Sequence, residues 1–419
     1  MTLDHNPRRL QRACAVALYG AFVWSAAAPG LHAEPAPPYE TLVEQAAASP
    51  AAAEAGALLD AAEARLRQAG VRPNPELSVE IENALGTRPF DGVSAAETTV
   101  ALSQDLELFG RRRARVDVAR AERGVAAARQ QAARVELPAR IALAYAEAEA
   151  ADRRAELARE ALDLALADAR SALALVEAGR EPLLRGIQGE AEAGAARAAY
   201  DEARAERDAA FARLTAVSVS PAPITSIPVS LIDRTPPPRS TMATATSAGV
   251  LTLEAERAAA ERRIRVEQLR GRPNVRASAG VRRFEAENAF ALVGGVSVQL
   301  PLFDQNRGNV AAAAAELRAV EARLLAARLD AEAEQAAARS RLAASASRVS
   351  ASDAGAAAAA EAYRLTRIGF EEGRLSALEL RSARGAVVQA RTAAIQARLS
   401  RTRAEADLAR LEGRRPFGT

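Results

Sequence analysis

The 419-residue chain is 26% charged and only 4% aromatic, and its 56 basic residues, all arginine, are nearly balanced by 53 acidic ones. This composition is typical of long helices packed side by side rather than of ordinary globular domains. The net charge of +3 does not indicate nucleic-acid binding, because arginine and glutamate alternate along helix faces as solvated or interhelical charge pairs do.

Residues 1–33 are expected to be a secretory signal. Three arginines precede the apolar stretch 13–28, and Ala33 offers a small residue for cleavage. The alternative, a membrane anchor, is disfavoured because the apolar stretch is shorter than the ~20 residues that a spanning helix needs. We therefore expect an exported protein.

Removal of this signal would leave few options for catalysis. The segment holds the single cysteine, Cys14, both histidines and the single tryptophan, Trp24. A mature chain without cysteine, histidine or lysine has no Ser-His-Asp triad, thiolate nucleophile, Schiff-base lysine or imidazole metal site. The sequence therefore predicts no enzyme, no cofactor and no resident metal.

The segment 34–74 is expected to hold a proline-rich lead, a short helical piece and a longer ascending helix. Ser49 and Pro50 predict the start of that helix, because serine accepts from free N–H groups and proline fits the first helical position. The helix should end at Ala69, before Gly70.

Two β-hairpins are predicted, at 75–108 and 274–303, because apolar and polar residues alternate there with period two. Both follow the same Arg-Pro-Asn sequence, at 72–74 and 272–274, so the chain contains an internal repeat. The polar positions of these strands include Glu80, Glu82, Asp105, Glu107, Arg276 and Arg282.

The four strands are long enough to cross a bilayer at a tilt. Four strands do not close a barrel, and open edges are not tolerated in lipid. Either the hairpins belong to a soluble sheet, or several chains pool their strands, and a trimer would supply twelve.

Each hairpin leads into a long helical hairpin, at 109–214 and 304–413. The first long helix, Arg111 to Glu177, would span about 100 Å before a turn near 178–183. The second hairpin turns near 371–376. An irregular linker (215–246), a second ascending helix (247–273) and a tail (414–419) complete the chain.

At this point the sequence resembles the TolC-like outer membrane factor family, and most closely its CzcC-like heavy-metal-efflux branch. The resemblance covers nearly all of the mature chain, and the order and duplication of its short motifs are more specific than any one of them. The motifs are Arg72-Pro73-Asn74-Pro75-Glu76-Leu77, Glu97-Thr98-Thr99 with Ser103-Gln104, Leu108-Phe109-Gly110-Arg111-Arg112, Val298-Gln299-Leu300-Pro301-Leu302-Phe303-Asp304 and Gly369 to Leu380.

The resemblance implies a mainly α-helical homotrimer with a β-hairpin pair in each chain. Antiparallel coiled-coil hairpins would form a periplasmic α-barrel, and four strands per chain would contribute to a twelve-stranded barrel in outer-membrane lipid. Such trimers are exit ducts of tripartite pumps, with a periplasmic adaptor and an inner-membrane resistance-nodulation-division transporter as partners. The sequence does not distinguish a metal cation from another small molecule as the substrate.

By the same resemblance, the two helix reversals would be the adaptor-docking tips. The expected docking residues are Gly179, Leu183, Gly373, Arg374, Leu375 and Ser376. Glu379 stands where the family has an acidic residue at the periplasmic aperture. The alternatives are a plain glycine C-cap at each turn and a solvated surface carboxylate at Glu379.

The polar strand residues are interpreted as lining the lumen, since water must meet the charged face of such strands. A periplasmic or surface coiled-coil scaffold remains the structural alternative to a duct, although it has no use for two bilayer-length hairpins. The adaptor subunit of such pumps is disfavoured, because it carries one helical hairpin where this chain has two.

Overall fold

The computed structural model describes residues 34–234 and 246–417, so the expected signal at 1–33 lies outside the described residues. The helices are α1 (Tyr39–Ala46), α2 (Pro50–Ala69), α3 (Arg111–Glu177), α4 (Leu183–Ser218), α5 (Ala248–Arg270), α6 (Arg307–Glu371) and α7 (Ala377–Leu411), with a 3-10 turn η1 (Leu108–Gly110). The strands are β1 (Glu34–Pro35), β2 (Glu76–Glu82), β3 (Glu97–Leu106), β4 (Ile224–Ser226), β5 (Asn274–Phe284) and β6 (Ala289–Gln299).

A local sequence signal accounts for the start of α2. Ser49 Oγ accepts from the backbone N of Ala52 at 3.3 Å, and Pro50 occupies the first position of α2.

Helix α3 continues through Pro138, which lacks the N–H needed for one helical hydrogen bond. Tyr39 Oη lies 3.1 Å from the carbonyl oxygen of Pro138, so α1 packs against α3 at this position.

The hairpins join into one antiparallel sheet with the strand order β2-β3-β5-β6. Strand β3 pairs with β5 over ten residues, from Glu97 with Phe284 to Leu106 with Val275. This contact joins the two copies of the repeat at the centre of the sheet. Strands β2 and β6 are left as its two edges, each paired on one side only within the described chain.

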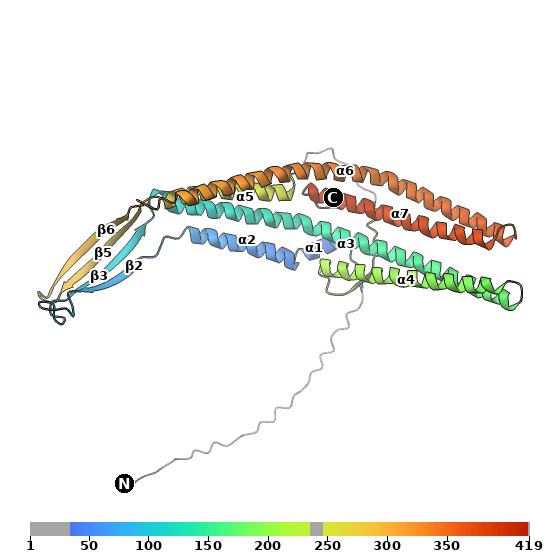
Figure 1. Ribbon diagram of the computed structural model, residues 1–419, viewed down its shortest axis with the longest axis horizontal. Helices are drawn as coiled ribbons and strands as arrows, with labels where there is room; N and C mark the ends of the chain where they lie inside the picture. Colours follow the sequence, from blue (N-terminus) through green and yellow to red (C-terminus); the bar gives the residue numbers. More distant parts are fainter. Residues whose placement is uncertain (1–33, 235–245, 418–419) are drawn as a thin grey trace, which may run out of the picture. The chain divides into compact units, whose positions relative to one another are not determined.

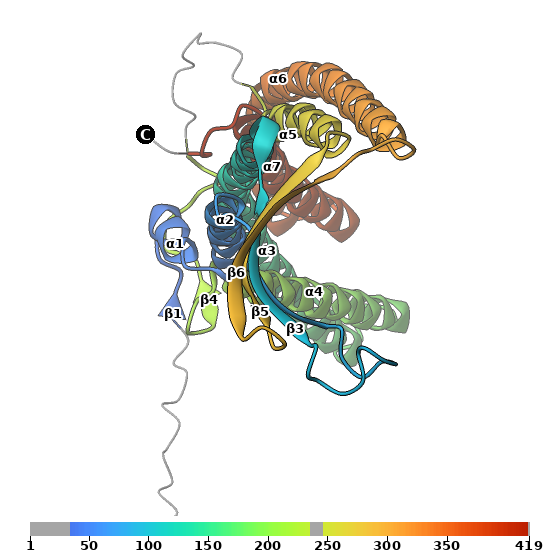
Figure 2. The same ribbon diagram turned by 90° about the vertical axis from the view of Figure 1, so that its left-hand side faces the viewer.

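The helices extend from one end of the sheet as a curved row (Figures 1 and 2). In the half of the row nearer the sheet, the helices lie side by side in the order α2, α3, α5 and α6 (Figure 1). In the half farther from the sheet, the order is α4, α3, α7 and α6 (Figure 1). The two long helices therefore run through both halves, while shorter helices fill the remaining places. Among the described residues, no helix is both long and apolar enough to cross a membrane.

The main hydrophobic core lies midway along α3, on the convex side of the row, where α1, β1 and β4 pack (Figure 2). We call these elements and residues 227–234 the belt. Buried Glu149 of α3 accepts from the backbone N of Leu231 at 2.8 Å and of Ile232 at 3.1 Å. Its carboxylate also pairs with Arg153 at 2.6 Å. These charge-assisted bonds hold an irregular segment on the helices.

Candidate functional site

The four-stranded sheet has one polar face, formed by the even-numbered residues of β2 and β5 and the odd-numbered residues of β3 and β6. Register places Glu80 opposite Thr99, and Thr99 opposite Arg282. Asp105 lies opposite Arg276 in the same way. Side chains of directly paired residues share one face of a sheet. The structure therefore brings together five charged residues singled out from the sequence, Glu80, Glu82, Asp105, Arg276 and Arg282.

Glu107 departs from this expectation. Strand β3 ends at Leu106, and the backbone turns at once through η1, where Phe109 has a positive φ of 60°. The Glu107 carboxylate pairs instead with Arg115 of α3, with Nη2 and Oε2 3.0 Å apart. The interpretation of Glu107 as a strand residue is thus corrected, because the alternation of faces stops where the strand stops.

Arginines of β5 bridge neighbouring strands on the polar face. Arg276 Nε donates to Asp105 Oδ1 at 2.8 Å, and its Nη1 donates to Glu76 Oε2 at 3.0 Å. One guanidinium therefore holds two carboxylates from β3 and β2. This is possible because an arginine presents several donors in a fixed planar arrangement.

Arg282 repeats this arrangement toward the hairpin turns. Its Nη1 donates to Glu97 Oε2 at 2.9 Å, and its Nε donates to Thr99 Oγ1 at 2.8 Å. Its Nη2 lies 2.9 Å from Glu82 Oε2 as an ion pair without hydrogen-bond alignment. Glu82 and Glu97 face each other directly across β2 and β3. Arg282 thus offsets the repulsion of two opposed like charges.

The opposite face of the sheet, called the apolar face below, is hydrophobic and exposed. Leu292 of β6 is 89% exposed, and Val296 and Leu77 are 69% and 67% exposed. Continuous exposed apolar surface on a folded chain marks a contact with lipid or with another protein.

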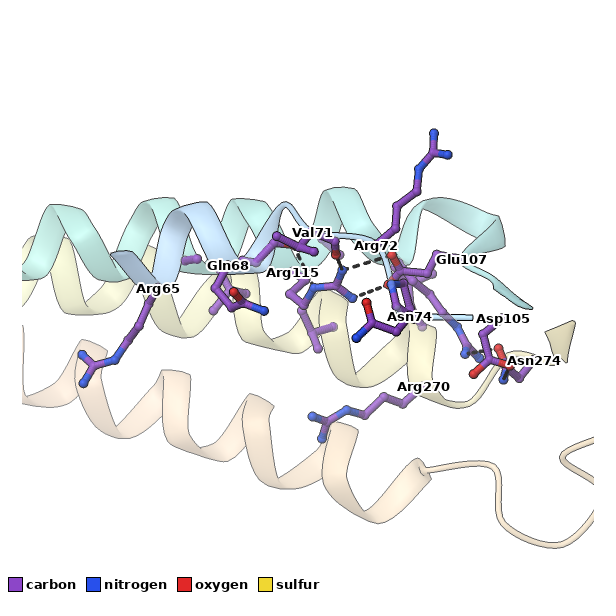
Figure 3. A pocket seen from close by; sticks show the side chains of 18 of the residues that line it. Arg65, Gln68, Val71, Arg72, Asn74, Asp105, Glu107, Arg115, Arg270 and Asn274 are labelled. Carbon is purple, nitrogen blue, oxygen red and sulfur yellow. Dashed lines mark hydrogen bonds and ion pairs between the residues drawn. The ribbon is translucent and has the colours of Figure 1, made fainter. Parts of the chain in front are cut away.

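A cavity of about 850 Å³ lies where the sheet meets the helices, between α2, α3 and α5 (Figure 3). We call it the junction cavity. Arg115 donates to the carbonyl oxygens of Ala69 at 2.9 Å and Val71 at 3.0 Å, beside its pair with Glu107. Asp105 also lines the cavity, so it is continuous with the polar face. No pattern in the sequence indicated this cavity, because its walls come from three separate segments of the chain, within residues 65–74, 105–122 and 266–274.

The two helical tips share one turn geometry. Gly179 and Gly373 have φ values of 69° and 72°, in the left-handed region that favours glycine. At the second tip, the backbone N of Arg374 donates to the carbonyl of Gly369 at 2.8 Å, and that of Gly373 to Phe370 at 2.9 Å. The first tip has the equivalent pair of bonds. Both are Schellman caps, which satisfy the last carbonyls of a helix.

Of the side chains expected to dock the adaptor, all but one are exposed at the tips. Leu183 is 67% exposed, as docking requires, and Arg374 and Ser376 are exposed. Leu375 is half-buried, because its side chain packs over Gly369. Two leucines that the sequence analysis did not single out, Leu184 and Leu378, are 62% and 66% exposed.

Leu184 and Leu378 occupy the same place in the two copies of the repeat. Each lies five residues after its turn glycine, Gly179 or Gly373. Alignment of the two turns would have found the pair. We use the name tip patch for these two leucines and Leu183, which are exposed apolar residues on the two tips.

Glu379 forms a capping box with Ser376 at the start of α7. Its carboxylate accepts from the Ser376 backbone N at 2.7 Å and hydroxyl at 2.8 Å, while Ser376 Oγ accepts from the Glu379 N at 3.3 Å. The spacing Ser-x-x-Glu was a readable signal for this motif. Helix α4 begins at Leu183, and its N-cap residue, Pro182, makes no side-chain capping hydrogen bond. The two tips are therefore alike in their turns and different in the helix that follows.

Acidification is expected to loosen the start of α7 without a matching change at the start of α4. The hydrogen bonds from Ser376 lower the pKa of Glu379 below its ordinary value of 4.5. A lowered folded pKa contributes stability above the ordinary pKa, and this contribution is lost as pH falls through the folded value. Hydrogen exchange at residues 376–380 and 183–187, corrected for intrinsic rates between about pH 5 and about pH 3, would measure it. Equal pH dependence in wild type and Glu379→Gln would refute the expectation.

The described residues contain no group of three or more histidine, cysteine, aspartate or glutamate side chains placed to hold a metal ion. On the polar face, the structure brings arginines and carboxylates together as ion pairs.

Residues 42–218 and 241–414 match the family model described as outer membrane efflux protein. The chain is 40% identical over 320 residues to the nickel and cobalt resistance protein CnrC of Cupriavidus metallidurans, covering 76% of each chain. It is 38% identical over 331 residues to the nickel-cobalt-cadmium resistance protein NccC of Alcaligenes xylosoxydans, covering 78% of this chain and 75% of NccC. The open-state MtrE outer membrane channel of Neisseria gonorrhoeae has a similar fold, with a TM-score of 0.76, 21% identity and 91% coverage of each chain.

Proposed function

Since the chain belongs to the outer membrane efflux protein family, we propose that it is the outer-membrane exit duct of a tripartite pump for divalent heavy-metal cations. One observation carries this proposal. Within the part of the chain that the structure describes, a four-stranded sheet with two open edges continues into a curved row of helices that is also open at both sides. A part shaped in this way is incomplete alone and closes when copies of it are arranged in a ring.

The proposed ring is a trimer with twelve strands. Strand β6 of one chain would pair with β2 of the next, because unpaired backbone groups at a sheet edge are not tolerated in lipid. In the same ring, α6 would pack beside α2 and α4 of the neighbour. The scaffold alternative has no support in the family match.

In this arrangement the polar face lines the lumen and the apolar face meets outer-membrane lipid. A transmembrane barrel with a water-filled channel has this alternation along every strand. The junction cavity would then form part of the inner wall where the barrel meets the helical duct.

The proposed partners are a periplasmic adaptor and an inner-membrane resistance-nodulation-division transporter. The tip patch supports adaptor docking, since solvent-exposed leucines at a helix reversal are suited to an apolar contact. Metal cations are the proposed cargo because CnrC and NccC are both named as metal resistance proteins. The ring of three Glu379 carboxylates at the aperture belongs to the same proposal, although each also caps α7.

The test is replacement of the corresponding duct gene in a cobalt-resistant Gram-negative host, with the adaptor and transporter genes kept. This chain should restore growth on cobalt, and detergent extracts of outer membranes should contain a trimer by native mass spectrometry. A water-soluble monomer that restores no resistance would contradict the proposal and return the scaffold alternative.

A further inference from the structure

The polar face holds carboxylates in excess, and most of them are already bound by arginine. Within the described strands, this face carries five carboxylates, from Glu76, Glu80, Glu82, Glu97 and Asp105, and only two guanidinium groups, both on β5. The excess of three negative charges attracts cations toward this surface. Of these five carboxylates, only that of Glu80 has no ion-pair partner among the described residues.

Without the arginines, the same carboxylates would be placed to hold a divalent cation. Glu82 and Glu97 are direct cross-strand partners, so their Cβ atoms lie about 5 Å apart. Two carboxylates at that separation offer oxygen ligands of the kind that divalent cations accept. The oxygens of this pair instead lie 2.9 Å from the two Nη atoms of Arg282.

We infer that Arg276 and Arg282 keep the duct wall from retaining divalent cations, because they occupy the cross-strand carboxylates that would otherwise bind them. The inference rests on the proposed function in one respect, the placement of the polar face in the lumen. A conducting pathway must attract its cargo strongly enough for entry and weakly enough for release. The excess charge provides the attraction, and the two arginines prevent retention.

The geometry of the two clusters favours Arg282 as the more important residue. Arg276 separates Asp105 from Glu76, which are diagonal neighbours because Glu76 lies opposite Ser103. Diagonal side chains are about 7–8 Å apart, too far for a single ion to be held equally well. Glu82 and Glu97, beside Arg282, are closer to each other. Removal of Arg282 should therefore increase divalent-cation binding more than removal of Arg276.

Purified trimer in detergent would be titrated with Mn²⁺ and followed by the electron paramagnetic resonance of the free ion. Mn²⁺ is the probe because it prefers carboxylate oxygens, and the affinity tag must contain no histidine. Arg282→Gln should bind Mn²⁺ at least about tenfold more tightly than wild type, a gain of about 1.4 kcal/mol. Arg276→Gln should show a smaller gain, and it replaces Arg282→Gln as the test variant if that trimer does not assemble.

Two controls separate this role from a general stabilisation of the sheet. Arg283→Gln alters the next arginine of β5, which lies on the apolar face and pairs with Glu285 at 3.0 Å, and it should leave Mn²⁺ binding unchanged. Adding Glu97→Gln to Arg282→Gln should abolish the new binding. The inference is overturned if Arg282→Gln binds no more tightly than wild type, or if Glu97→Gln removes binding that wild type already has.

The proposed function and the role of the two arginines are tested by different measurements. A wild-type chain that gives no cobalt resistance would refute the duct, whereas the Mn²⁺ titration on the purified protein would still decide whether the two arginines block cation binding.

Discussion

Replacing Leu292 by arginine is expected to remove the assembled trimer from the outer membrane. Leu292 lies on the apolar face of β6, two residues from the middle of the strand, and is 89% exposed in the single chain. An arginine near the bilayer midplane on the lipid side costs about 2–4 kcal/mol. The ring would carry this cost three times, which is comparable with the whole stability of a domain, about 5–15 kcal/mol.

The adjacent residue provides the matched control. Val293 lies on the polar face, opposite Gly280 and diagonal to Arg282. The charge of Val293→Arg would face the water-filled side of the sheet, so this variant should assemble nearly as well as wild type. Trimer in outer-membrane fractions would be quantified on gels with and without heating. Equal loss in both variants would mean that β6 does not separate lipid from water.

Leu184→Asp combined with Leu378→Asp is expected to abolish cobalt resistance while trimer assembly stays intact. Both side chains are exposed, at 62% and 66%, so aspartate costs little in the free trimer. If the adaptor covers them, each aspartate must be desolvated without a partner, at a cost of several kcal/mol. Docking should therefore weaken by at least about a hundredfold.

Gln188→Asp is the control for the effect of an added charge on one tip, because it places a single aspartate at an exposed position one helical turn beyond Leu184. Resistance and chemical cross-linking to the adaptor would be measured together with trimer content. Normal cross-linking of the double variant would refute the tip patch as the docking surface. Loss of the trimer would show that these leucines stabilise the chain itself.

Much of the fold could be predicted because its determinants are local. The bounds of α3 and the start of α2 follow from composition and from the Ser49-Pro50 cap. The alternation in β2, β3, β5 and β6 predicted two faces, and register confirms that each is continuous across the sheet. Family membership was also predictable, since it depends on duplicated motifs spread along the chain.

Other features depended on where a local pattern ends or on partners distant in sequence. Glu107 continues the alternation of β3 by one step, yet the turn at η1 directs it to Arg115. Leu375 was expected to be exposed, but the Schellman turn folds it over Gly369. The capping box between Ser376 and Glu379 could have been predicted from the Ser-x-x-Glu spacing.

The repeat, the long helices, the two-sided strands and the scarcity of catalytic side chains in the expected mature chain can all be read from the sequence, because each depends on residue type or on spacing within one element. Three features required the folded chain: β3 and β5 join the two copies, the sheet has two open edges within the described residues, and Arg282 lies between Glu82 and Glu97. The contacts of Arg282 with Glu97 and Glu82 join residues about 185 and 200 positions apart. Their pairing is set by strand register, which periodicity alone leaves undetermined.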